Sequence, residues 1–435
     1  MRIWRHRPGS ALLASAAALS LLTAACGGDD SEASGDAGGD GTVSGEITLL
    51  TPIYEGTDGE KLLEEELLPQ FYEQYPDVSV SVDYTTYGTL NEKLTTAVAS
   101  GLVPDVMMMG VGWVEGFADK GVLRDLSEFG ITAESLQESY TEQIVRAGMW
   151  EDSVYAVPIM LDTRFAVARK DILAEAGFDE PPSTWEELRE YAIALTEREP
   201  DGTLTRAGFD MLSHDLRQMY EVFLFSSGAS LFNDDVTEPA FNSPEGVEAL
   251  QFMTDLINED KVEDIGFSGS DSQVHPLVNG RAAMGLAHNN LWLQVQESAP
   301  ELSDQFVPFL ITGEQPGMFF GGTLATVSAN SEHPEAAAAL LEFLSGPEAA
   351  LAANEQRGNV PALTELLDTD YVQKNPFVQF AMENLEHAQN EGGPPQWIEI
   401  RGEFTPAIEA ALLGQKTPQE ALDDLAATAS EAMGR

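Results

Sequence analysis

Aromatic, carboxylate, guanidinium and amide side chains near the ends of predicted strands have the clearest chemical potential in this chain. In doubly wound sheets, the loops that follow the strands line the ligand crevice. Aromatic faces stack on the apolar face of a pyranose ring, while carboxylates, Arg and Asn bind hydroxyl groups. The mixture therefore predicts a site for a hydroxyl-rich ligand such as a sugar. The candidates are Tyr54, Glu55, Trp113, Asp162, Arg164, Tyr220, Glu221, Asn290, Trp292, Phe319, Phe320, Gly321, Gly322, Trp397 and Arg401.

Each candidate taken alone also has a purely structural interpretation. An isolated Trp is more often part of the core than of a binding site. An isolated Arg–Asp pair is usually a surface or structural contact. The prediction of a site therefore rests on the group of residues and not on any single one.

Catalytic signatures are absent from the sequence. There is neither a GxxxxGK[ST] phosphate loop nor a GxGxxG turn after a strand, and the nearest approach to a GxSxG elbow, GFSGS at 266–270, departs at its last residue. Acidic residues are so numerous that close carboxylate pairs arise by chance, so a glycosidase dyad has no support. No HExxH pattern occurs, and we expect neither a metal site nor a cofactor. The histidines after residue 25 are scattered, at His214, His275, His288, His333 and His387.

The first 26 residues resemble a bacterial lipoprotein signal. Arg2, Arg5 and Arg7 precede an apolar run at 11–22, and the letters LTAAC at 22–26 place small residues before Cys26, the only cysteine. The apolar run is shorter than the ~20 residues that a bilayer requires. The resemblance implies cleavage after residue 25, diacylation of Cys26, and a mature protein anchored by lipid to the outer face of the cell membrane. An ordinary secretory signal with a chance cysteine is the alternative.

Composition limits the class of protein and its partners. Residues 26–44, the lipidated Cys and a disordered acidic tether, contain almost nothing apolar. The rest of the 435-residue chain is long enough for two domains, and without a second cysteine it has no internal disulfide. Three arginines lie in the signal, which leaves 19 basic and 73 acidic residues and a net charge of −54. Such a charge repels nucleic acid, so we expect no nucleic-acid partner.

The folded part begins near Gly45 and alternates strands with helices. Alternating or continuous apolar runs predict strands, and apolar residues at helical spacing predict helices. This order predicts βαβ units and a parallel sheet. The predicted strands are 46–52, 78–82 and 104–109, and the predicted helices between them are 59–75 and 90–99.

Residue types that favour helix starts and stops indicate where the later helices begin and end. Thr184 and Glu187 are spaced as a capping box, in which hydroxyl and carboxylate accept from free N–H groups. Proline follows Ser243, His333 and Thr417, at the first helical position that tolerates it. Gly346 and Gly414 stand where helices are expected to end.

The order of segments over residues 45–435 resembles the extracellular solute-binding proteins of family 1, the maltose- and trehalose-binding group of carbohydrate ABC importers. No single segment is specific, but ten in family order behind a lipoprotein signal are strong evidence. They are ASGLVPDV (99–106), GWVEGFADKGVL (112–123), YAVP (155–158), ARKDIL (168–173), EPPSTWEEL (180–188), NGRAAM (279–284), GGTLA (321–325), HPEA (333–336), GNVPA (358–362) and GQKTPQEAL (414–422).

The resemblance implies an α/β, two-lobed periplasmic-binding-protein-like fold of type II, with doubly wound sheets joined by three hinge crossovers. The crossovers fall at 162–165, 321–324 and 361–364. Lobe one comprises 45–162 plus 325–362, and lobe two comprises 166–321 plus 365–435. The ligand lies between the lobes, and closure about the hinge buries it.

The resemblance also assigns roles to the candidates. Asp162 matches the acidic ligand at the first crossover, and Gly321 with Gly322 lets the backbone approach the sugar. Arg401, near Trp397, matches a contact close to the C-terminus. The other matches are Tyr54 and Glu55 after the first strand, Trp113 after the third, Tyr220 with Glu221 in lobe two, and Asn290 with Trp292 at an aromatic platform. Gly110 stands where many members have Asp, and Asn290 replaces an aromatic residue, so the identity of the sugar stays open.

The implied function is an extracytoplasmic substrate-binding lipoprotein that captures a sugar and delivers it to the transmembrane subunits of an ABC permease, as a monomer and without catalysis. One alternative is the same fold binding a glycerophosphodiester, an osmolyte or a polyamine, although Arg164 and Arg401 disfavour a cation. A secreted carbohydrate-active enzyme and a structural cell-wall protein are the alternatives from other classes.

Overall fold

The computed structural model describes residues 42–213, 215–267 and 274–435. The predicted signal, Cys26 and most of the tether lie outside the described residues, as does His214. Residues Val43–Arg435 form one compact unit.

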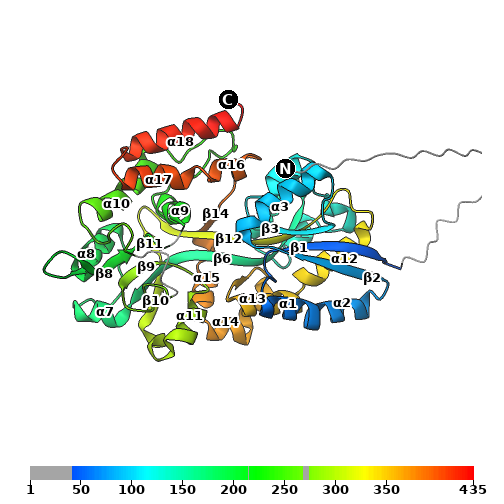
Figure 1. Ribbon diagram of the computed structural model, residues 1–435, viewed down its shortest axis with the longest axis horizontal. Coiled ribbons are helices and arrows are strands. Elements are labelled where there is room, and N and C mark those ends of the chain that lie inside the picture. Colours follow the sequence, from blue (N-terminus) through cyan, green and yellow to red (C-terminus); the bar gives the residue numbers. More distant parts are fainter. Residues whose placement is uncertain (1–41, 214, 268–273) are drawn as a thin grey trace, which may run out of the picture. The chain divides into compact units, whose positions relative to one another are not determined.

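A mixed sheet of twelve strands runs through the described part of the chain (Figure 1). Parallel pairing joins β1 to β2 and β3, β8 to β9, and β12 to β14, whereas β12 is antiparallel to β3 and β6, and β6 to β9. The prediction of a parallel sheet was therefore wrong for its centre. The main order is β2 (Val78–Tyr84), β1 (Gly45–Thr51), β3 (Val106–Gly110), β12 (Pro316–Val327), β6 (Ala156–Arg169), β9 (Ala282–His288), β8 (Leu204–Asp210) and β7 (Glu197–Arg198).

The short strands extend this sheet or form a separate hairpin. Strands β10 (Phe306–Phe309) and β13 (Val360–Pro361) pair with β6, while β11 (Ile311–Thr312) and β14 (Ala388–Asn390) pair with β12. The hairpin consists of β4 (Met149–Trp150) and β5 (Ser153–Val154).

Helices surround the sheet, and the predicted helices at 59–75 and 90–99 are confirmed. The first is interrupted by a π-helical stretch at Leu62–Leu67. The helices are α1 (Thr57–Lys61), α2 (Leu68–Gln74), α3 (Tyr87–Ser100), α4 (Val114–Asp119), α5 (Ala133–Leu136), α6 (Glu142–Arg146), α7 (Lys170–Glu175), α8 (Trp185–Leu195), α9 (Leu216–Ser226), α10 (Pro244–Asn258), α11 (Leu291–Ser298), α12 (Pro334–Ser345), α13 (Pro347–Arg357), α14 (Asp370–Lys374), α15 (Pro376–Glu383), α16 (Trp397–Arg401), α17 (Phe404–Leu412) and α18 (Pro418–Ala432). Short 3₁₀ turns lie at Leu126–Phe129, Pro300–Gln305, Thr364–Asp368 and Leu385–His387.

The helix starts predicted at Pro244, Pro334 and Pro418 are confirmed, and the capping box predicted at α8 needs a correction. The Thr417 side chain and Glu420 form a complete capping box at α18, and Ser243 caps α10. At α8, Thr184 accepts from the Glu187 N–H as predicted, but the Glu187 carboxylate accepts from the backbone and hydroxyl of Ser183 instead of from Thr184. The carboxylate therefore reaches one residue farther back than a capping box requires.

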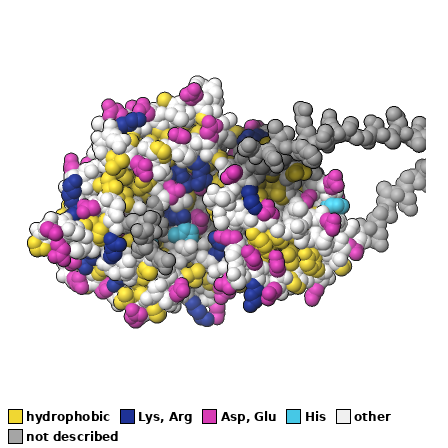
Figure 2. All heavy atoms as spheres, in the orientation of Figure 1, with side chains coloured by type: hydrophobic (Ala, Val, Ile, Leu, Met, Phe, Trp, Pro, Cys, Tyr) yellow, Lys and Arg dark blue, Asp and Glu magenta, His cyan; other side chains and the backbone are white. Residues whose placement is uncertain are grey.

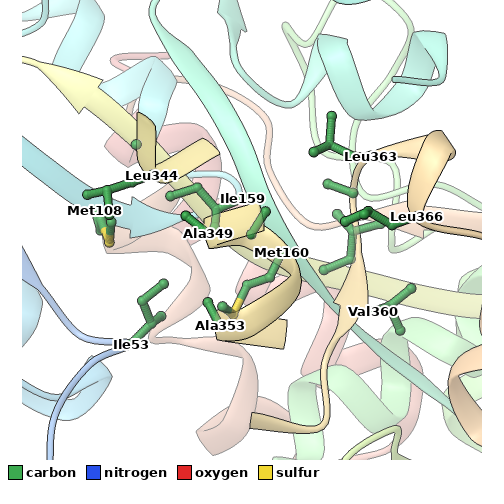
Figure 3. Packing of buried hydrophobic residues seen from close by; sticks show 14 of the residues in the cluster. Ile53, Met108, Ile159, Met160, Leu344, Ala349, Ala353, Val360, Leu363 and Leu366 are labelled. Carbon is green, nitrogen blue, oxygen red and sulfur yellow. The ribbon is translucent and has the colours of Figure 1, made fainter. Parts of the chain in front are cut away.

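The core beside strands β3 and β6 is closed by two small-residue helices. Helices α12 and α13 present alanines that allow close packing, and Leu344 is fully buried. Figure 3 shows this packing: Leu344, Ala349 and Ala353 lie with Met108, Ile159 and Met160. Burial of this apolar surface is the main favourable term in folding.

The described residues contain neither a long apolar helix nor a cluster of metal-ligating side chains. Among the described residues, no single helix is long and apolar enough to cross a bilayer; α12 and α13 meet that test only together, as a pair bent by 58°. Within the same residues, no group of three or more His, Cys, Asp or Glu side chains is arranged to hold a metal ion.

Candidate functional site

Strand β6 carries the centre of the candidate site. Because side chains alternate along a strand, Asp162 and Arg164 lie on the same face of the sheet. Asp162 Oδ1 lies 3.6 Å from Arg164 Nη1, and Asp162 Oδ2 lies 3.6 Å from His288 Nε2. His288 ends β9, in register with Arg164. Three adjacent side chains thus offer a carboxylate, a guanidinium and an imidazole to a ligand.

The charges of this trio follow from their mutual contacts. Burial acts to raise the pKa of Asp162, but Arg164 and His288 outweigh it and hold that pKa below its ordinary value. Burial and the charge of Arg164 lower the pKa of His288, which is therefore neutral at pH 7. His288 Nδ1 accepts the Asn290 N–H at 3.0 Å, which leaves the proton on Nε2, facing Asp162.

The Arg164 guanidinium is only partly hydrogen-bonded. Its Nη1 donates to the Thr163 carbonyl at a long 3.3 Å, and its Nε has no hydrogen-bond partner among the described residues. The guanidinium lies 5.8 Å from the centre of the Phe319 ring, and the residue is only 9% exposed. A buried guanidinium with unfilled donors is costly, and an acceptor-rich ligand would relieve that cost.

A second group of side chains extends the site toward β1 and α13. Arg357 Nη1 lies 3.2 Å from Glu55 Oε2 and donates to the Ile53 carbonyl. The Tyr87 hydroxyl shares a hydrogen bond with Thr323 Oγ1. Burial raises the pKa of Tyr87, and the charges of Asp162, Arg357 and Glu55 also act on it, so these groups share one neighbourhood.

A third, more buried group lies between α9 and α16. Arg217 Nη1 lies 2.8 Å from Glu221 and 2.7 Å from Glu391, and Arg401 Nη2 lies 3.4 Å from the same Glu391 oxygen. The Arg401 guanidinium lies 5.8 Å from the Trp113 ring centre. Burial raises the pKa of Glu221 to about 7, Glu391 adds to the effect, and Arg217 opposes it.

Buried donors without partners accompany this third group. Trp113 Nε1, Trp397 Nε1 and Arg217 Nη2 have no hydrogen-bond partner among the described residues, although each residue is at most 5% exposed. Such atoms are rare in folded proteins. They favour a ligand that supplies oxygen acceptors.

Several predicted residues are not brought to this site. Tyr54 is fully buried in the core, and the Tyr220 hydroxyl donates to the Phe241 and Gly246 carbonyls. Trp292 packs with its ring centre 5.5 Å from that of Phe377. Phe320 is in register with Thr163 and so points away from the face that carries Asp162. Phe319, in contrast, lies beneath Arg164.

The predicted loop positions also need correction. Asp162, Arg164 and 319–322 lie inside strands, whereas Tyr220, Glu221, Trp397 and Arg401 lie inside helices. Close packing within the described residues explains why positions 321 and 322 are glycines. A Cβ on Gly321 would lie 2.7 Å from Asp162 Oδ1, and one on Gly322 would lie 2.3 Å from the Met160 carbonyl.

Sequence reasoning missed His288, Arg217, Glu391, Tyr87 and Arg357. His288 carried a usable signal, since it ends an apolar run two residues before Asn290. Asn289 was missed as well: its side chain accepts the Thr163 N–H at 2.7 Å and donates to the Gly358 carbonyl at 2.6 Å.

A cavity of about 800 Å³ is lined by Phe320, which lies on the face of β12 opposite Phe319. Its walls also come from α6, β4 and the segments near 232 and 390. Figure 2 shows basic, acidic and histidine side chains gathered near the middle of the visible face.

Comparison with known proteins identifies the family. Residues 56–351 match the bacterial extracellular solute-binding proteins. The chain belongs to this family. A maltodextrin-binding protein of Bacillus subtilis is 24% identical over 426 residues, covering 96% of this chain and 95% of its own. An sn-glycerol-3-phosphate-binding periplasmic protein of Salmonella typhimurium is 24% identical, covering 86% and 90%.

Solved structures of solute-binding proteins share the fold. The GacH receptor of Streptomyces glaucescens, solved unliganded and with acarbose, has a TM-score of 0.75 at 22% identity, covering 90% of this chain and 99% of its own. The predicted family, the α/β class and the type II solute-binding-protein fold are therefore confirmed. Membership of this family places the protein outside the cytoplasm.

Proposed function

We propose that this solute-binding protein captures a sugar, most simply an oligosaccharide, between two lobes and delivers it to the permease of an ABC importer. The lobes are those predicted, 45–162 plus 325–362 and 166–321 plus 365–435. In support, the three predicted crossovers lie on neighbouring strands: Asp162 pairs with Gly321, and Met160 with Pro361. Bending of adjacent strands is a simple way to open and close a cleft.

The observation that carries the proposal is the Asp162–Arg164–His288 trio beside buried donors that lack partners. Asp162 offers acceptors, while Arg164 and the neutral His288 offer N–H groups within the same few ångströms. A sugar hydroxyl both donates and accepts, so neighbouring hydroxyl groups satisfy such a mixed set. The names of the relatives that bind maltodextrin and acarbose support a carbohydrate.

The mechanism is differential affinity and not covalent chemistry. A ligand that contacts both lobes binds the closed state more tightly than the open one and shifts the population toward it. The closed form is then the form that the permease recognises. We propose that the protein is a monomer, without enzymatic activity, held at the membrane by lipid on Cys26.

A second candidate ligand is a phosphorylated polyol. The unfilled donors of Arg164 and Arg217 suit phosphate oxygens, and one relative is named for binding sn-glycerol 3-phosphate. The neighbouring carboxylates of Asp162 and Glu391 oppose an anion at the same place. A neutral sugar is therefore the preferred candidate ligand.

A binding panel tests the proposal. Thermal unfolding would be followed with maltose, maltotriose, longer maltodextrins, galactooligosaccharides and sn-glycerol 3-phosphate, since a ligand that binds only the folded state raises the melting temperature. We expect at least one neutral oligosaccharide to stabilise the protein, and Asp162→Ala to abolish that stabilisation. Asp171→Ala is the matched control, because Asp171 also pairs with a neighbouring arginine, Arg169, at the end of β6. No shift with any sugar, or an unchanged shift in Asp162→Ala, would refute the proposal.

A further inference from the structure

Helix α4 and the segment 391–397 meet at a contact that only glycines permit. A Cβ on Gly116 would lie 2.6 Å from the Pro395 carbonyl oxygen. A Cβ on Gly112 would lie 2.9 Å from Trp397 Nε1 and 3.0 Å from Gly392 Cα. Backbone thus touches backbone between two segments that are far apart in the sequence.

This contact sets the place of two predicted ligand-binding side chains. Trp397 is the last residue of the segment and the first of α16, and its indole lies against Gly112. Arg401 ends the same helix, and its guanidinium lies over Trp113, the residue that precedes α4. A shift of the segment relative to α4 would move both side chains relative to the Asp162 trio.

Gly112 and Gly116 are glycines for different physical reasons. Gly112 has φ +80°, a conformation that favours glycine whatever its neighbours. Gly116 lies inside the helix, outside the left-handed region, where alanine would stabilise the helix better than glycine. The nearness of Pro395 is the reason that the structure offers for glycine at 116.

From this geometry we infer that Gly116 is a positioning residue for ligand capture, because it lets α4 of lobe one dock on the 391–397 segment of lobe two when the lobes close. The inference rests on the proposed two-lobe function. In this proposal the contact between the two lobes forms on closure, so a side chain at 116 disfavours closure without disturbing either lobe. Gly116 therefore acts on the ligand through Trp397 and Arg401.

Gly116→Ala tests this inference, with Gly88→Ala as the matched control. Gly88 is also helical, in α3, and a Cβ there would meet its nearest neighbour, Thr86 Oγ1, at an ordinary 3.7 Å. In the full chain carrying Cys26→Ser, spin labels would be placed on cysteines at Leu102 and Leu413, which are 79% and 52% exposed. The distance between the labels would be measured by pulsed electron paramagnetic resonance, with and without excess maltotriose.

The parent is expected to populate the label distance of this structure in at least one of the two samples. Gly116→Ala is expected to lose most of that population, and Gly88→Ala to retain it. The melting temperature of unliganded Gly116→Ala should equal or exceed that of the parent. The inference is overturned if Gly116→Ala keeps the closed distance, if the parent never shows it, or if the variant loses stability without a change in distance. The proposed function is judged separately, because the thermal-unfolding panel reads sugar binding by the parent and does not use the label distance.

Discussion

Glu115→Gln is expected to remove a pH dependence of stability. Glu115 lies in α4, two residues after Trp113, and its Oε2 has no hydrogen-bond partner among the described residues. Burial raises the pKa of Glu115 from 4.5 to about 7, and the negative charge of Glu391 adds to the effect. The carboxyl therefore keeps its proton in the folded state at pH values where it would ionise in the unfolded chain.

The sign and size of this pH dependence follow from the coupling between protonation of Glu115 and folding. A carboxyl whose pKa is raised on folding stabilises the protein below the unfolded-state pKa of 4.5, and this contribution is lost as the pH rises toward 7. A pKa change from 4.5 to about 7 corresponds to about 3 kcal/mol between the two ends of that range. The amide introduced by Glu115→Gln cannot ionise, so the variant should lack this loss.

The charged residues around Glu115 decide which variant is a suitable control. Glu391 lies one residue before Gly392, and a Cβ built on Gly392 would lie 3.5 Å from Glu115 Oε1. Arg401 and Arg217 also contact Glu391. Glu142, Arg146 and Glu151 line the same cavity as Glu115. Glu142→Gln is the matched control, because its side chain is 65% exposed.

Urea unfolding between pH 4 and pH 8.5 measures the effect. At pH 8 the free energy of unfolding of Glu115→Gln should exceed that of the parent by up to about 3 kcal/mol, and at pH 4 the two should agree. Glu142→Gln should follow the parent throughout. Equal pH slopes in the parent and Glu115→Gln would show that Glu115 ionises normally in the folded protein and would refute the reasoning.

Three other changes probe the site, the hinge region and the anchor. Arg401→Ala should abolish the sugar-induced change in tryptophan fluorescence while the circular dichroism spectrum stays unchanged; a normal titration would remove Arg401 from the site. Asn289→Leu should lower the free energy of unfolding by about 2–4 kcal/mol, because it leaves the Thr163 N–H and the Gly358 carbonyl without their partner. Asn242→Leu should cost far less, because the Asn242 amide donates to the exposed Asp423. Cys26→Ser should release the protein from the membrane into the medium, and retention of that variant in the membrane fraction would contradict lipid anchoring.

Local features of the fold could be predicted from sequence because their causes lie within a few residues. The helix start at Pro418 and the strand at Val78–Tyr84 depend on residue types and spacing that are visible in the sequence. The capping carboxylate of Glu187 shows the limit, since Ser183 and Thr184 offer neighbouring N–H groups and only the three-dimensional path of the chain decides between them.

Long-range features could not be predicted in the same way. The antiparallel placement of β12 between β3 and β6 depends on pairing between segments far apart in sequence. The site shows the same division. Asp162 and Arg164 are near neighbours in the sequence and were both candidates by residue type and position, whereas the Arg217–Glu391 pair and the His288–Asp162 contact depend on how separate strands and helices meet.

The position of β12 bears on how the protein is made. Strand β12 fills the sheet between β3 and β6, although both of those strands are synthesised well before it. Helices α12 and α13, which seal the adjacent core, come later still. The N-terminal half of a nascent chain therefore cannot complete its sheet until Val327 and the helices after it have been made. A chain that must cross a membrane before folding benefits from this order, because an unfinished sheet remains in a form that an export channel can thread.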